Sequence, residues 1–309
     1  MAGGGGLDGG GGRTLATYCH FHLGSDARLA PAIVAAARRG QRVVSLLPSA
    51  TEMVAAVLGE AGAAARLVGV SEHCDWPAAV VAGKRVVTRS AVATRAGRSG
   101  AEVDAAVRAA REAGVGAAHT VDVAWLAAAR PALVLTQDTC AACDAAEGSV
   151  HAALRAAGLG PERALTLRPV TVAGVLGSVR RLGAALGEEA AAEATAARLE
   201  ARLAAVERAV LASAGEEAAR PRLLGLESLF PLVASGQWLP DQRARAGARD
   251  ALGDEPGGAA RLVSWAEVEG CGAEAVVLCC CGRTAAGAAA EAEQHLLSQT
   301  LPRHFLDTS

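Results

Sequence analysis

The chain has 309 residues, of which 51% are hydrophobic but only 3% are aromatic. Alanine makes up roughly a quarter of the chain, far above common usage, so leucine and valine must supply most of the core-forming area. Thirty basic residues against 32 acidic ones give a net charge of −2 without a basic stripe, which argues against nucleic-acid binding. No apolar run reaches the 18 or more residues of a membrane span.

Residues 1–41 are predicted to be a disordered or targeting segment, because they are Gly-rich at the start and lack the apolar core of a secretory signal. The eight cysteines include the run Cys279–Cys281, which is poor geometry for a disulfide framework. We therefore expect a cytoplasmic or organelle-stroma location, with export left open as the alternative.

From Arg42 onward, short apolar runs alternate with helical patterns, which is typical of βα units and a mainly parallel sheet. Pro48 ends the first strand, and the pattern from Ser49 to Glu52 predicts a capping box. The strands expected in the first lobe, residues 42–187, are 42–47, 67–70, 85–88, 133–136 and 164–167, and the helices are 49–58, 102–113, 123–129, 150–157 and 172–186.

Residues 188–219 are predicted to hold one long linking helix, because 188–214 contains no Gly or Pro and has a single apolar stripe. The stripe consists of Leu199, Leu203, Val206 and Val210. At 1.5 Å per residue this helix would span about 40 Å, long enough to cross between two lobes. A coiled-coil dimer is the competing interpretation, which the short stripe disfavours, so a monomer is expected.

Residues 220–309 return to βα patterning and are predicted to form a second lobe. Its expected elements are strands 222–226 and 275–279, a short helical or loop segment 240–247, a polar loop 250–261, and helices 264–269 and 284–297. The predicted fold class is therefore α/β, with two Rossmann-like lobes joined by one long helix.

Chemistry-bearing residues gather after the predicted strands, where ligands of open parallel sheets bind. Six of the eight cysteines lie in or directly after strand ends. The Cys140-x-x-Cys143 pair is either half a metal or redox site or two small buried residues. Trp76 and Trp238, on loops in different halves, either stack on a large flat ligand from both sides or pack only their own loops.

The remaining aromatic residues and histidines are expected to be structural. Trp125 and Trp265 lie on helical patterns and are predicted to be in the core. The histidines predicted to be at the surface or structural are His119, His151, His295 and His304. Because the chain has no nucleophile elbow, GxGxxG motif or Walker loop, we do not expect an enzyme.

Three segments together resemble a known family: RVVSLLPSATE (residues 42–52), LVGVSEHCDWP (67–77) and LVLTQDTCAAC (133–143). In this order they are similar to the helical-backbone substrate-binding proteins of ABC transporters, which bind iron siderophores or cobalamin, and most of all to the cobalamin-binding branch. The resemblance covers residues 42–291. Relative to that family the chain stops at Ser309 before a last strand and helix, so the second lobe is expected to be truncated.

The resemblance implies a ligand held in a cleft between the lobes. The implied ligand-binding residues are Glu72, His73, Asp75, Trp76, Gln137, Glu227, Gln237, Trp238 and Arg283. Ser49 is a further candidate, because it lies at a predicted helix N-terminus that can face an anion. The chain departs from the family pattern at Ser228, Gln237 and His119, where a Trp, a His and an aromatic residue are usual. Because no export signal is recognised, delivery to an ABC permease does not follow from the resemblance.

Two hypotheses result. In the first, the protein is a non-catalytic binder whose partner is a small-molecule metal chelate, such as cobalamin or another corrinoid. In the second, it is a soluble metal or redox protein that holds Zn, an Fe–S cluster or cobalt through Cys140, Cys143 and Cys281 with Cys74 or His73, since thiolates select such metals. Sulfur atoms of Cys140 and Cys281 within about 4 Å of each other would favour the second.

Overall fold

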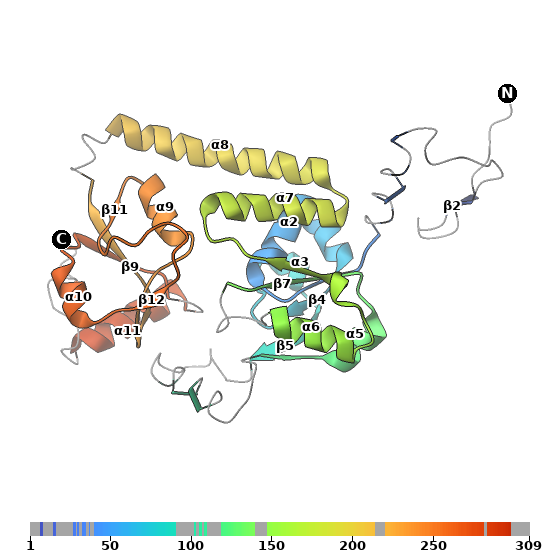
Figure 1. The fold of residues 1–309 in the computed structure, drawn as a ribbon, viewed down its shortest axis with the longest axis horizontal. Coiled ribbons are helices and arrows are strands. Elements are labelled where there is room, and N and C mark those ends of the chain that lie inside the picture. Colours follow the sequence, from blue (N-terminus) through green and yellow to red (C-terminus); the bar gives the residue numbers. More distant parts are fainter. Residues whose placement is uncertain are drawn as a thin grey trace.

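The computed structural model describes residues 40–90, 119–139, 147–213, 220–280 and 283–297, with a few isolated positions between 7 and 37 and between 102 and 109. Two α/β lobes lie side by side, and helix α8 (Glu189–Ser213) runs along both of them (Figure 1). Within residues 1–41, β1 (Leu7–Asp8) pairs antiparallel with β2 (Leu15–Ala16). The helix predicted over 102–113 falls mostly outside the described residues.

The first lobe is built on a six-stranded sheet with the order β6-β5-β4-β3-β7-β8. Its strands are β3 (Val43–Ser45), β4 (Leu67–Ser71), β5 (Arg85–Ser90), β6 (His119–Val121), β7 (Leu133–Gln137) and β8 (Ala164–Leu167). Neighbouring strands from β5 to β8 are parallel, and β6 pairs antiparallel with β5 at the edge. The parallel part of the sheet confirms the predicted α/β class, whereas β6 was not predicted.

Helices cover both faces of this sheet, which explains why its central strands β3, β4 and β7 are largely apolar. They are α2 (Pro48–Arg66), α3 (Ala78–Val81), α5 (Val123–Ala129), α6 (Glu147–Ala156) and α7 (Val172–Leu186), with a 3-10 turn at Pro161–Arg163. Successive residues of β3 point to opposite faces. Val43 joins a core with residues of α2 and α7, and Val44 joins a core with residues of α5 and α6; both are fully buried.

The start and end of α2 differ from the prediction. Leu47 is the N-cap and Pro48 occupies the first turn, so Ser49 lies inside the helix and the predicted capping box is wrong. Proline at this position explains the shift, because its missing N–H costs nothing in the first turn of a helix. The helix also continues beyond Leu58 to Arg66, across a kink at Gly59 with φ 71°.

The second lobe has a smaller, mixed sheet. Its elements are β9 (Arg222–Leu229), β10 (Leu232–Ala234), α9 (Leu239–Arg245), β11 (Arg249–Asp250), β12 (Arg261–Leu262), α10 (Trp265–Gly270), β13 (Ala275–Leu278) and α11 (Ala285–Leu297). β9 pairs parallel with β11 and β13 and antiparallel with β10, which pairs in turn with β12. The segment predicted as a polar loop over 250–261 therefore ends in a strand, and the hairpin of β9 and β10 was missed.

Helix α8 is packed firmly at its beginning and more loosely at its end. Gly183 of α7 lies so close to α8 that a Cβ there would be 2.1 Å from the Cβ of Ala192. Thr195 donates to the carbonyl of Ala56 at 3.1 Å. The predicted apolar stripe is not a buried face, because Val206 is 48% exposed and the buried residues of α8 are Ala192, Thr195 and Ala196.

The two lobes also meet directly. The Asp241 carboxylate in α9 accepts a hydrogen bond from the Val172 amide at the start of α7, 3.0 Å away. Arg245 pairs with that same Asp241 at 2.8 Å and with Glu207 of α8. The described helices include none that is both long enough and apolar enough to cross a bilayer.

Candidate functional site

The carboxyl edge of the first sheet gathers polar side chains from β4 and β5. Ser71 ends β4, and Glu72 and His73 follow it directly. The Glu72 carboxylate accepts a hydrogen bond from the Ser90 amide at the end of β5, and its Oε1 lies 3.9 Å from Nε2 of His73. The sequence placed Glu72 and His73 at this edge from the strand pattern alone, and the structure brings them together.

His119 joins this cluster, although the sequence predicted a surface or structural role for it. It begins β6, is only 4% exposed, and its ring lies 5.7 Å from that of His73 between centroids, edge to face. Neither of its ring nitrogens has a hydrogen-bond partner among the described residues. Burial, and then the neighbouring His73, lower the pKa of His119.

A buried polar group without a partner costs about 1–3 kcal/mol, so the placement of His119 is expensive for a purely structural residue. Sequence reasoning missed it because β6 has only three residues and pairs antiparallel with β5. Neither feature leaves a periodic pattern in the chain.

The loop after β4 carries the most exposed aromatic residue of this lobe. Trp76 is 61% exposed, and Asp75 beside it is exposed as well. Gln137, at the end of β7, is buried and accepts hydrogen bonds from the amide and hydroxyl of Thr139 at 2.6 and 2.7 Å. Ser49 is exposed within α2.

The predicted cysteine site is only partly described. Cys140, Cys143 and Cys281 lie outside the described residues. Cys74 is buried and receives a hydrogen bond from the Thr51 hydroxyl at 3.1 Å. Within the described part of the chain, no group of three or more His, Cys, Asp or Glu side chains is positioned to hold a metal ion.

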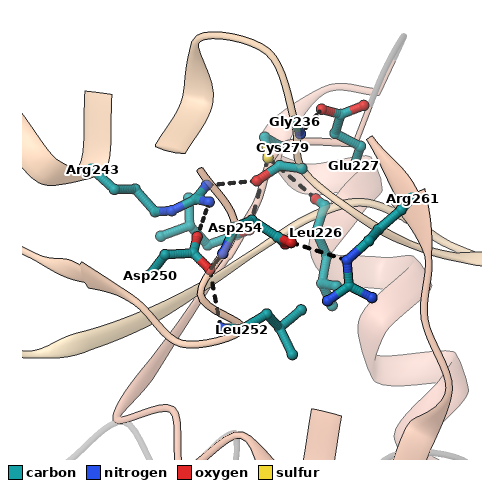
Figure 2. A network of polar contacts seen from close by, with 11 residues as sticks. Leu226, Glu227, Gly236, Arg243, Asp250, Leu252, Asp254, Arg261 and Cys279 are labelled. Carbon is teal, nitrogen blue, oxygen red and sulfur yellow. Dashed lines mark hydrogen bonds and ion pairs between the residues drawn. The ribbon is translucent and has the colours of Figure 1, made fainter. Parts of the chain in front are cut away.

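The second lobe contributes a loop between β10 and α9. Glu227 of β9 accepts a hydrogen bond from the Gly236 amide at 3.0 Å (Figure 2). Burial raises the pKa of Glu227, against the opposing effects of that amide and of Arg243. Gln237 has a φ of 50°, and Trp238 is the half-buried N-cap of α9.

This loop lies against the first lobe. Gln237 exchanges backbone hydrogen bonds with Gly257 and Gly258. Gly257 in turn sits beside Val170 and Thr171, which follow the carboxyl end of β8. The loop of Gln237 is therefore connected, through Gly257 and Gly258, to the residues that follow β8 of the first sheet.

Arg283 is the remaining predicted residue. Its guanidinium pairs with Glu291 of α11 at 3.2 Å, and both side chains are largely buried. Trp125 and Trp265 pack against the cores of the first and second lobe, as predicted.

Several solved structures share the fold. A periplasmic vitamin B12 binding protein of Vibrio cholerae is 17% identical, with a TM-score of 0.55 over 84% of this chain and 82% of that one. A periplasmic heme binding protein of Pseudomonas aeruginosa is 21% identical, with a TM-score of 0.56 over 82% and 77%. An ABC transporter substrate-binding protein of Listeria monocytogenes is 14% identical, with a TM-score of 0.58 over 86% and 84%. No family model and no curated protein sequence matches the chain.

These comparisons confirm the predicted two-lobed fold and the resemblance to iron, heme and vitamin B12 binding proteins at the level of the fold. They contradict the cytoplasmic or stromal location expected from the sequence, because the similar vitamin B12 and heme binding proteins are periplasmic. Nothing in them supports Zn or an Fe–S cluster.

Proposed function

We propose that the protein is a non-catalytic binding protein that holds a metal chelate, such as a corrinoid or a heme, between its two lobes. The fold supports this class of function, since the vitamin B12 and heme binders with the same fold are solute-binding proteins. The observation that carries the proposal is the exposed Trp76 at the carboxyl edge of the first sheet, where ligands of such sheets bind.

Trp76 offers a flat apolar surface that a macrocycle can cover. A buried indole contributes area and favours stacked or edge-to-face contacts with another ring system. The loop of Gln237 and Trp238 would face the ligand from the second lobe, and the carboxylates of Glu72 and Glu227 would supply polar groups that orient it. A membrane permease is the partner that such a binder would serve.

The test is a titration of the purified full chain with three probes: cyanocobalamin, hemin and a ferric hydroxamate siderophore. We expect one of them to bind at one equivalent per chain. Trp76→Ala should weaken that binding about three- to tenfold, because an aromatic contact contributes roughly 0.5–1.5 kcal/mol beyond area.

Leu211→Ala is the matched control, since Leu211 is a 68% exposed apolar side chain on α8. It should leave binding and thermal stability unchanged. If none of the three probes binds, or if the Trp76 and Leu211 variants bind equally well, the proposed function is wrong.

A further inference from the structure

Two buried imidazoles face each other at the edge of the first sheet. His73 and His119 are 9% and 4% exposed, and their rings meet edge to face with centroids 5.7 Å apart. Both ring nitrogens of His119 are buried and lack a hydrogen-bond partner in the described part of the chain. This position suits a neutral ring, because burying a charge without a partner costs far more than burying an uncharged polar group.

The two rings oppose each other's ionisation. Burial, and then the neighbouring His73, lower the pKa of His119, and Glu72 acts in the opposite direction. Oε1 of Glu72 lies 3.9 Å from Nε2 of His73, and the Ser90 amide donates to the same oxygen. One carboxylate balances one imidazolium, so a second imidazolium in this place would be left without a counter-charge.

The other charged groups around β6 in the described part of the chain are turned away or already paired. On β5, Arg89 lies beside Thr120 and therefore on the opposite face of the sheet from His119. Helix α6 packs against β6 and carries Glu147, His151 and Arg155. Of these, Glu147 is paired with the arginine that follows β8 and lies near His151, and Arg155 is exposed.

Strand β6 is the element that a charge in this place would loosen. It has three residues and lies at the edge of the sheet, where β5 is its neighbour among the described strands. His119 is paired with Ser90, whose amide also holds Glu72, so the histidine cluster is joined directly to the pairing of the two strands. A short edge strand can open without unfolding the rest of a sheet, because few contacts hold it.

We propose that His73 and His119 act as an acid-sensitive switch that keeps β6 paired with β5 at neutral pH and lets it separate as the imidazoles ionise. In the separated state the rings reach water and take up protons at the ordinary histidine pKa of about 6.5. Because the pKa of His119 is lowered in the closed state, its stabilising contribution is present above that ordinary value and is lost as pH falls through the lower pKa. The switch needs no ligand and is therefore independent of the proposed function.

Hydrogen exchange of the unaltered full chain at about pH 7.5 and about pH 5.5 tests the switch, with each rate divided by the intrinsic exchange rate at that pH. A ring that ionises only after opening increases the opened population about tenfold between these two values. Protection of the peptide that contains β6 should therefore fall about tenfold, while peptides from β7 should keep their protection. This measurement does not depend on how any variant folds.

The variant His119→Gln has no imidazole at this position, so the fall in protection of β6 should shrink to less than about twofold. His151→Gln is the matched control, because His151 lies on α6 and is half-buried, and it should show the same fall as wild type. The inference is overturned if β6 of the wild-type protein is equally protected at both pH values or if β7 loses protection to the same extent. It is also overturned if the His119 variant shows the same fall as the His151 variant.

Discussion

Replacing Arg243 with methionine should destabilise the second lobe strongly, because it leaves a buried carboxylate without its counter-ion. Arg243 and Asp250 form an ion pair in which the side chains are 9% and 11% exposed. The guanidinium also donates to the Ser235 hydroxyl at 2.5 Å. The neighbouring Gly225 has no room for a side chain, since a Cβ there would lie 2.2 Å from Nη1 of Arg243.

The loss of stability expected for Arg243→Met depends on the hydrogen bonds that the Asp250 carboxylate retains. Breaking a buried ion pair by removing one partner costs about 3–5 kcal/mol. The Asp250 carboxylate retains hydrogen bonds from the amides of Leu252 and Asp254, both at 3.0 Å. These bonds partly satisfy the charge, so we expect the lower end of the range, about 3 kcal/mol for Arg243→Met.

The double variant Arg243→Met, Asp250→Asn removes both charges and should recover at least about 1 kcal/mol of the loss. Hydrogen exchange measured by mass spectrometry reports each lobe separately. Peptides from β9 should exchange faster in the single variant, while peptides from β7 should not change. Arg249→Met, at an exposed arginine, is the control and should stay within about 0.5 kcal/mol of wild type.

A single variant that costs less than about 1 kcal/mol would refute this reasoning, because the Arg243–Asp250 pair would then not behave as a buried one. A double variant as unstable as the sum of its two single variants would refute it as well. In that case the guanidinium would stabilise the lobe through packing rather than through the charge of Asp250.

Three further variants test other parts of the structure. Gly69→Ala should cost about 1–3 kcal/mol in thermal unfolding, because its Cβ would lie 2.5 Å from Cγ2 of Val87; full stability would contradict this close packing. Glu227 has a raised pKa when folded, so its contribution to stability is present at acidic pH and is lost as pH rises through that pKa. The melting temperature of Glu227→Gln should therefore increase relative to that of wild type as the pH is raised from acidic to neutral. A difference in melting temperature that does not change with pH would contradict the pKa shift. The Asp241 carboxylate accepts a hydrogen bond from the Val172 amide at 3.0 Å, so Asp241→Ala should speed hydrogen exchange at that amide. Unchanged exchange would show that this bond does not hold the lobes together.

The first lobe was predictable because the ends of several of its helices and strands are determined by residues next to them in the sequence. The ranges 123–129, 164–167 and 172–186 match α5, β8 and α7 residue for residue. Asp122 and Thr171 cap the two helices, while Arg130 and Gly187 end them in the left-handed region. Such signals depend on one or two neighbouring residues and so survive in a single sequence.

The second lobe was harder to predict because its strands depend on distant partners. β11 and β12 have only two residues each, and β10 has three. β12 exists because Val233 and Ala234 pair with Leu262 and Arg261, a contact that no local pattern encodes. The same reason hid His119, whose importance comes from the ring of His73 more than 40 positions away in the chain.

The candidate site shows the same division. Glu72, His73 and Trp76 were found because they follow a buried strand, and sheet geometry alone places such residues at the carboxyl edge. Asp241, which lies outside the candidate site, was not predicted either, since it accepts its hydrogen bond from the Val172 amide of the other lobe. Residues that act within one βα unit were predictable, and residues that join two units were not.

The two ends of α8 are held by different kinds of contact. Near its beginning, Ala192 packs against Gly183 at a distance that only small residues permit, and Ala196 is fully buried. Towards its end, Val206 and Leu211 are exposed, and α8 meets the second lobe through the ion pair of Glu207 with Arg245 and through Val210, which lies against Gly247. Close packing is rigid, whereas a half-exposed ion pair contributes little and is screened by salt. Helix α8 is therefore attached to the first lobe by close packing of small residues, and to the second lobe by one half-exposed ion pair together with the contact of Val210 and Gly247.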